Sequence, residues 1–151
     1  MTASSDNILE RLQAGVRTTN VAETEAVAAA FAPLLAPGSV LCLQGPLGAG
    51  KTAFVRGLAQ GLGCTDLVSS PTFNLLQVYD GPRRLLHLDA YRIERPEGLN
   101  DLGLEELFND AAVLAVEWPE KVATALPPDC WWLELQSVDE RTRSIQTLRC
   151  P

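Results

Sequence analysis

The sequence lacks both a long apolar run and a secretion signal. No stretch approaches the ~18 apolar residues that a membrane-spanning helix requires. The first residues, MTASSDNILERLQ, do not show the basic-then-apolar order of a signal peptide. We therefore expect a cytoplasmic protein that does not associate with a membrane.

Metal-binding spacings of cysteine and histidine are also absent. Cys42, Cys64, Cys130 and Cys150 are far apart and form no C-x-x-C pair, and His87 is the only histidine. A structural zinc site needs about four such ligands, commonly with short spacings between them. The pattern does not indicate a zinc site and favours reduced, structural cysteines.

Basic residues are scarce. The chain has twelve lysines and arginines and nineteen acidic residues, so the net charge is −7 and the isoelectric point is near 4.6. Proteins that grip nucleic acids usually carry a basic stripe, because neutralising phosphates supplies much of their affinity. If this protein acts on RNA or DNA, we expect a partner to hold the nucleic acid.

The 151 residues indicate one α/β domain over 18–151, preceded at 1–17 by a mobile extension or a loosely attached helix. A helix is expected from Asn20, a capping residue with Glu23 three positions on, to the Pro37-Gly38 break. Further along the chain we predict a strand at 40–44, a helix at 49–60, strands at 73–80 and 83–91, two short helices in 95–110, and strands at 112–119, 130–137 and 143–150. The segment 63–72 is rich in turn residues. Together these elements predict a P-loop NTPase-like domain with a mixed, partly parallel sheet flanked by helices.

A phosphate-binding motif joins the strand at 40–44 to the next helix. Gly45-x-x-x-x-Gly50-Lys51-Thr52 is the spacing of a loop whose backbone amides, together with the helix N-terminus, bind phosphate oxygens. Lys51 would reach the β- and γ-phosphates, and the Thr52 hydroxyl would bind Mg²⁺. A strand before the loop and an amphipathic helix after it are what this mechanism requires.

Two acidic residues end apolar runs farther along the chain. Asp89 and Glu117 could hold the metal ion or orient a water molecule, although Asp89 could also cap a turn and Glu117 could be a surface charge. Thr72, in VSSPTF, could serve as a switch hydroxyl or belong to an ordinary turn. His87 is expected to be packed in its strand. The tryptophans at 118, 131 and 132 are expected in packing roles.

Three functions fit these residues. ATP hydrolysis coupled to a partner protein requires the fewest additional residues, so it is the preferred interpretation. A small metabolite or nucleoside kinase and a nucleotide-gated adaptor are the alternatives. A kinase usually closes an arginine-bearing lid over the phosphates. Here 93–111 is acidic and contains only Arg95. The arginines at 83, 84, 92 and 95 could offset phosphate charge or lie on a solvated face, and no arginine finger can be assigned.

Four segments in order, GPLGAGKT, SPTF, HLDAYR and VEWPE, resemble the TsaE (YjeE) family of bacterial ATPases over about 21–143. The resemblance implies a P-loop α/β fold and slow ATP hydrolysis with Mg²⁺. It also implies a role in N6-threonylcarbamoylation of the adenosine next to the anticodon of certain tRNAs. The family acts there with the TsaD and TsaB proteins, so tRNA would be contacted only indirectly through the complex.

The resemblance also implies roles for individual residues. Asp89 and Glu117 become the Walker B and second acidic residues, Thr72 matches a switch-like position, and Trp118 becomes a candidate for packing around the site. The phosphates and nucleotide would be bound by Gly48, Ala49, Gly50, Lys51, Thr52, Ala53 and Thr24. Two positions depart from the family pattern: Pro46 replaces Asp, which stiffens the loop entrance, and Ala90 replaces a larger apolar residue.

Overall fold

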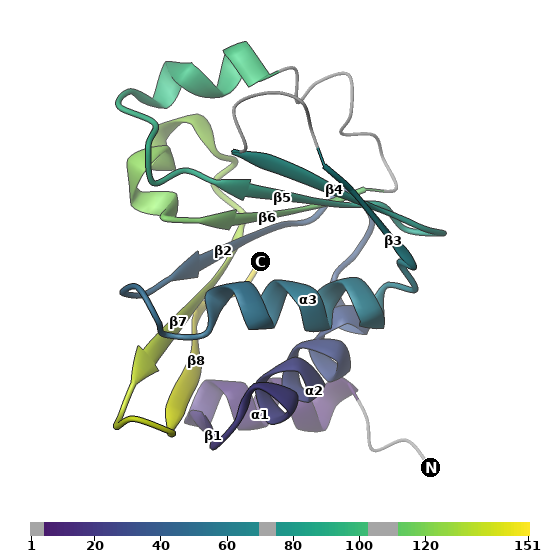
Figure 1. Ribbon diagram of the computed structural model, residues 1–151, viewed down its shortest axis with the longest axis vertical. Coiled ribbons are helices and arrows are strands. Elements are labelled where there is room, and N and C mark those ends of the chain that lie inside the picture. The colour runs from purple at the N-terminus through teal and green to yellow at the C-terminus, as the bar shows by residue number, and fades with distance from the viewer. Residues whose placement is uncertain (1–4, 70–74, 103–111) are drawn as a thin grey trace.

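The computed structural model describes residues 5–69, 75–102 and 112–151. Within these ranges the chain forms one mixed eight-stranded sheet with helices on both faces (Figure 1). The strands are β1 (Val16–Thr18), β2 (Val40–Gln44), β3 (Asp66–Ser69), β4 (Leu76–Asp80), β5 (Leu85–Asp89), β6 (Val113–Glu117), β7 (Trp131–Ser137) and β8 (Arg143–Arg149). Their order across the sheet is β1-β8-β7-β2-β6-β5-β4-β3.

The centre of the sheet is parallel and its edges are antiparallel. β2 pairs in parallel with β6 and β7, and β6 pairs in parallel with β5. β3–β4, β4–β5, β7–β8 and β1–β8 are antiparallel. The carboxyl ends of β2, β5 and β6 therefore lie at one edge of the sheet, which is where ligands bind in open α/β folds.

Helices α1 (Ser5–Ala14), α2 (Val21–Phe31) and α3 (Lys51–Gly61) cover one face of the sheet, with the short 3-10 helix η1 (Ala32–Leu34). The other face is covered by η2 (Pro96–Leu102), η3 (Pro119–Lys121) and η4 (Ala123–Ala125). In β2, Leu41 and Leu43 pack with α2 and α3. Val40 and Cys42 point to the opposite face and belong to a second cluster of buried side chains, whose other members include Leu76, Leu86, Leu88, Ala90 and Val116. Burial on both faces explains why this strand is a continuous apolar run.

Local sequence signals place several elements where they were expected. The Asn20 side chain accepts a hydrogen bond from the Glu23 amide at the start of α2, as the capping pattern predicts. The strand–loop–helix unit of β2 and α3 and the β4–β5 hairpin also follow the prediction. The mixed, partly parallel sheet confirms the predicted fold class.

Other elements differ from the sequence-based prediction. The turn-rich segment 63–72 contains strand β3, which pairs with β4, and the short strand β1 was not expected at all. Over 1–17, described as a mobile extension or a loosely attached helix, the structure has α1, whose Ile8 and Leu12 are buried. η2 lies in the first part of 95–110, and 103–111 lie outside the described residues. No helix in the described ranges is long and apolar enough to cross a membrane.

Candidate functional site

The loop between β2 and α3 depends on two glycines with positive φ. Gly45 has φ 152°, and a Cβ there would lie 2.2 Å from the backbone oxygen of Leu135. Gly50 has φ 100° and stands at the N-cap of α3. Side chains are strained at both angles. Glycine at these positions lets the loop pass close to β7 and turn directly into the helix.

Lys51 begins α3, and its ammonium group is buried. Its Nζ donates a hydrogen bond to the Gly45 carbonyl at 2.5 Å and lies 3.8 Å from the ring centroid of Trp118. Burial lowers the pKa of Lys51, while the nearby charges of Glu117, Glu120 and Asp89 oppose that shift. Three acidic side chains therefore lie close enough to Lys51 to favour its charged form against the effect of burial.

Trp118, whose ring contacts Lys51, has an unusual backbone conformation. It is the one non-glycine residue with positive φ among the described residues, at φ 57° and ψ 49°. Its ring also packs on Tyr91, with 5.0 Å between ring centroids. A left-handed conformation costs a bulky residue about 1–2 kcal/mol, so surrounding contacts hold this ring beside the glycine-rich loop.

The two predicted carboxylates meet at the ends of neighbouring parallel strands. Asp89 and Glu117 are register partners of β5 and β6. Glu117 is 6 % exposed, which rules out a surface charge, and its Oε2 lies 3.5 Å from the Thr52 hydroxyl. Asp89 accepts a hydrogen bond from the Tyr91 amide at 3.0 Å, so it also closes a turn.

Behind Glu117 lies the chain's single histidine. Nε2 of His87 lies 2.5 Å from Oε2 of Glu117, and both side chains are buried. The second ring nitrogen, Nδ1, lies 3.4 Å from Oε1 of Gln77. His87 is packed in its strand, as expected, but it also contacts a predicted metal ligand, which the sequence analysis did not anticipate.

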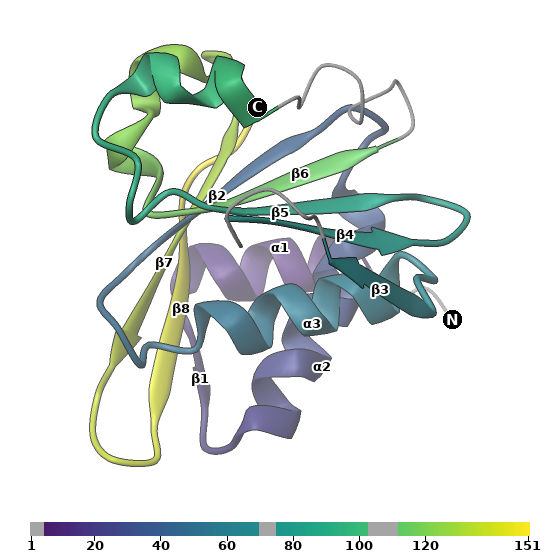
Figure 2. The same cartoon turned by 45° about the horizontal axis from the view of Figure 1, so that its top comes forward.

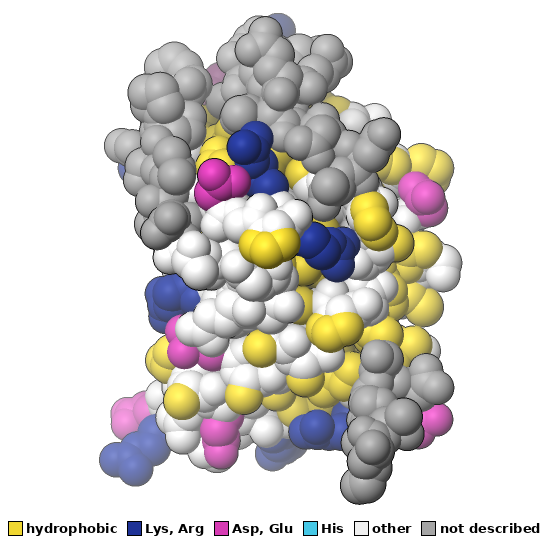
Figure 3. Space-filling view, turned by 90° about the vertical axis from the view of Figure 1, so that its right-hand side faces the viewer, with side chains coloured by type: hydrophobic (Ala, Val, Ile, Leu, Met, Phe, Trp, Pro, Cys, Tyr) yellow, Lys and Arg dark blue, Asp and Glu magenta, His cyan; other side chains and the backbone are white. Residues whose placement is uncertain are grey.

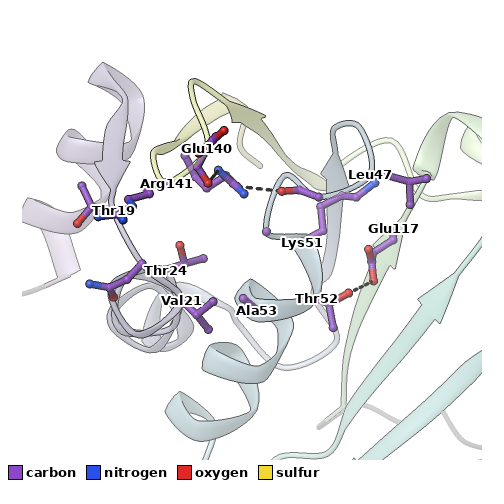
Figure 4. Close-up of a pocket in the computed structure, with 14 residues that line it drawn as sticks. Thr19, Val21, Thr24, Leu47, Lys51, Thr52, Ala53, Glu117, Glu140 and Arg141 are labelled. Carbon is purple, nitrogen blue, oxygen red and sulfur yellow. Dashed lines mark hydrogen bonds between the residues drawn. The ribbon is translucent and has the colours of Figure 1, made fainter.

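A cavity of about 530 Å³ opens beside these groups. Figure 4 shows its two sides: Thr19 precedes α2, Val21 and Thr24 lie in the first turn of that helix, and Lys51, Thr52 and Glu117 lie opposite. This volume lies within the ~300–1,000 Å³ typical of small-molecule sites. Among the predicted binding residues, Gly48, Gly50, Lys51, Thr52, Ala53 and Thr24 line the cavity.

Predicted site residues outside that lining have different positions. Ala49 is fully buried within the loop. Asp89 is near enough to Lys51 for its charge to oppose the lowering of the lysine pKa. Thr72 lies outside the described residues, so its switch role stays a prediction. The Thr24 hydroxyl is 2.7 Å from that of Thr18 and is buried.

Two cavity-lining arginines come from the hairpin of β7 and β8. Nε of Arg143 donates to the Gly48 carbonyl at 2.9 Å, and its Nη1 donates to the carbonyls of Asp139, Glu140 and Thr142. Arg141 also lines the cavity. Figure 2 shows the end of this hairpin beside the loop that follows β2. Arg143 therefore links the hairpin to the glycine-rich loop.

The four arginines that the sequence analysis considered for phosphate charge do not line the cavity. Arg83 donates to the Leu35 carbonyl at 2.6 Å, and Arg84 lies 3.6 Å from Asp80. Arg92 and Arg95 are exposed and do not line the cavity. The positive charge at the cavity therefore comes from Lys51 and the β7–β8 hairpin.

Residues 18–145 match the family model described as "Threonylcarbamoyl adenosine biosynthesis protein TsaE". The chain belongs to the TsaE family. A TsaE from Bacillus subtilis is 42 % identical over 130 residues, covering 85 % of this chain and 81 % of that protein. A TsaE from Treponema pallidum is 45 % identical over 112 residues, covering 74 % of this chain and 83 % of its own. Both are described as tRNA threonylcarbamoyladenosine biosynthesis proteins.

A solved structure also supports the fold. The crystal structure of Bacillus subtilis YdiB superposes with a TM-score of 0.70 at 36 % identity, covering 88 % of this chain and 82 % of that one. The two departures from the family pattern are accommodated within the fold. Pro46 accepts a hydrogen bond from the Ala49 amide through its carbonyl, and Ala90 is fully buried in the second cluster.

His87 and Arg143 are the site residues that the sequence analysis missed in this TsaE-family chain. A signal for His87 was available: it precedes Asp89 by two positions, so both side chains lie on the same face of β5. Arg143 left no comparable signal, because 95 residues separate it from Gly48. That contact depends on the strand order, which brings β8 close to the loop.

Proposed function

We propose that this chain is the ATP-binding and ATP-hydrolysing protein of tRNA threonylcarbamoyladenosine formation. It would act in the cytoplasm with TsaD and TsaB, and regulate or reset the transferase that they form. The modified base is the adenosine next to the anticodon. Membership of the TsaE family supports the pathway, and the geometry of the site supports the nucleotide chemistry.

The observation that carries the nucleotide chemistry is the meeting of Thr52 and Glu117 at the start of α3. Their oxygens lie 3.5 Å apart at the edge of the cavity, beside the buried ammonium of Lys51. A helix N-terminus, a buried lysine and a hydroxyl–carboxylate pair are the groups that bind a metal–triphosphate. A cavity built only to hold an apolar ligand would not need them.

The chemistry of this donor set fits Mg²⁺. In the described part of the chain, no three His, Cys, Asp or Glu side chains cluster as a metal cage. Mg²⁺ is usually held by one or two carboxylates with phosphates and several waters, and Thr52, Asp89 and Glu117 would hold it here. When bound, the ion would neutralise charge that develops on the phosphates.

The chain's own residues would carry the rest of the reaction. Lys51 can exchange its contacts with the Gly45 carbonyl and the Trp118 ring for phosphate oxygens without leaving the site. Asp89 or Glu117 would orient the attacking water. Hydrolysis by the chain alone would be slow and would rise when partner proteins complete the site.

The surface charge supports indirect contact with tRNA. On the face shown in Figure 3, the described lysines and arginines are scattered singly among acidic and neutral side chains. With a net charge of −7, such a face offers no continuous track for a phosphate backbone. TsaD and TsaB would therefore hold the tRNA.

Labelled ATP tests the reaction class. Incubation of the protein with γ-labelled ATP, Mg²⁺ and a panel of metabolites should release label as inorganic phosphate. Label on an organic acceptor would indicate the kinase alternative, and intact bound ATP would indicate the adaptor. Lys51→Ala should abolish binding, whereas Lys121→Ala, the chain's other lysine, should bind ATP as the parent does.

Reconstitution tests the pathway. Purified TsaD and TsaB should form an ATP-dependent complex with the protein, raise its phosphate release and yield threonylcarbamoyladenosine in tRNA. Lys51→Ala should fail in all three measurements. Failure of the parent protein to bind either partner, with and without ATP, would refute the assignment to this machinery.

A further inference from the structure

We propose that His87 is the positioning residue that fixes Glu117 in the geometry needed for ATP hydrolysis. The inference rests on the proposed function and deepens it. In this arrangement His87 contacts neither nucleotide nor metal ion, and it acts only through the Glu117 carboxylate.

The sheet register brings three polar side chains into one row. Gln77 on β4 is the register partner of His87 on β5. His87 pairs with Ala115 on β6, so Glu117, two positions farther, lies diagonally opposite on the same face. The row Gln77–His87–Glu117 therefore runs across three strands toward Thr52 on α3.

The contact with His87 is the stronger of the two that hold Glu117. A separation of 3.5 Å from Thr52 is at the limit of a hydrogen bond, whereas 2.5 Å from Nε2 of His87 is short. A buried carboxylate is costly unless it is paired. His87 thus satisfies Glu117 where it stands, while Thr52 remains available to a ligand.

Gln77 completes the arrangement at the other ring nitrogen. For Nε2 of His87 to donate to Glu117, Nδ1 must have a partner compatible with that tautomer. An amide can present either its oxygen or its nitrogen to Nδ1. When the Gln77 amide donates its N–H to Nδ1, the single proton of the neutral imidazole lies on Nε2 and points at Glu117. When the Gln77 oxygen instead accepts from Nδ1–H, only the doubly protonated ring also donates from Nε2.

The mechanism needs this support because Glu117 has flexible side-chain torsions. Removing residues that orient metal-ligating groups typically costs about 10- to 100-fold in activity or metal affinity. We expect His87→Leu to lower kcat and to raise the Mg²⁺ concentration for half-maximal rate within that range. The KM for ATP should change little, because the phosphate-binding loop is untouched.

Two variants separate positioning from packing. In His87→Gln the amide N–H can reach the place of Nε2–H, so this variant should recover most of the lost activity. Leu88→Val removes one methylene group from the core on the same strand but on the opposite face, and it should keep the parent's kcat and Mg²⁺ dependence. Thermal unfolding of every variant reports the purely structural contribution.

A double variant tests whether His87 acts through Glu117. If it does, His87→Leu should not slow Glu117→Gln any further, so the two effects should not add. Additive losses would overturn the proposal. It would also be overturned if His87→Leu behaved as the parent, or if His87→Gln and Leu88→Val lost as much activity as His87→Leu.

A spectroscopic measurement keeps the proposal testable if the chain does not hydrolyse ATP. His87 is the only histidine, so the tag-free protein gives one set of imidazole ¹⁵N resonances. At fixed pH, Glu117→Gln should shift the Nε2 resonance more than the Nδ1 resonance. An unchanged Nε2 resonance would refute the contact between His87 and Glu117. If the resonance shifts but the protein does not hydrolyse ATP, the contact stands and the proposed function is refuted.

Discussion

Arg143 offers a sharp mutational test of the proposal that the cavity beside the glycine-rich loop binds ATP. Its guanidinium links the Gly48 carbonyl to three carbonyls at the end of the β7–β8 hairpin. Arg143→Ala removes this link and a positive charge at the edge of the cavity. A charged hydrogen bond contributes about 1.5–3 kcal/mol, and we expect about 1–2 kcal/mol here because the group is partly exposed to solvent.

That free energy corresponds to about 5- to 30-fold weaker ATP binding, since about 1.4 kcal/mol is tenfold. Isothermal titration calorimetry with a non-hydrolysable ATP analogue measures it directly. Arg143→Lys should be intermediate, because lysine keeps the charge but cannot bridge several carbonyls. Arg149, on the same strand but stacked over Trp132, is the matched control, and Arg149→Ala should bind as the parent does.

The reasoning would be wrong if folded Arg143→Ala bound the analogue with the parent's affinity. It would also be wrong if Arg149→Ala weakened binding as much, because the effect would then reflect overall charge. Thermal unfolding of both variants ensures that the comparison is made between folded proteins.

Further predictions concern stability and thiol chemistry. Gly57→Ala places a Cβ 2.2 Å from a backbone oxygen of α2, so it should destabilise the protein by about 1–3 kcal/mol. Calorimetry should show a clear fall in Tm for this variant, whereas Gln60→Ala, at an exposed position of the same helix, should keep the parent's Tm. Burial raises the pKa of the Cys42 and Cys130 thiols, so an aromatic disulfide reagent at neutral pH should modify exposed Cys150 first. Rapid labelling of Cys42 in the folded protein would contradict its burial.

Local patterns were sufficient to predict the elements that carry their own signals. Capping by Asn20, the apolar run of β2 and the glycine-rich loop are encoded within a few residues, and each formed as expected. The predicted Thr52, Asp89 and Glu117 come together because the carboxyl ends of parallel strands share one edge of the sheet.

Features that depend on long-range pairing could not be predicted in the same way. Strand β3 lies in a segment rich in turn residues, and its pairing with β4 outweighs that local preference. The partners of His87 and Arg143 are fixed by strand order and register, which periodicity does not reveal. The sequence therefore predicted the glycine-rich loop and the carboxylates at the strand ends, but not the contacts that His87 and Arg143 make with them.

The most direct test of the central claim is a crystal structure with Mg²⁺ and a non-hydrolysable ATP analogue. We predict the triphosphate at the N-terminus of α3, with Lys51 on its β- and γ-phosphates. The metal ion should lie within coordination distance of Thr52, directly or through water from Glu117 and Asp89. An analogue bound elsewhere, or a metal ion remote from both carboxylates, would contradict the account.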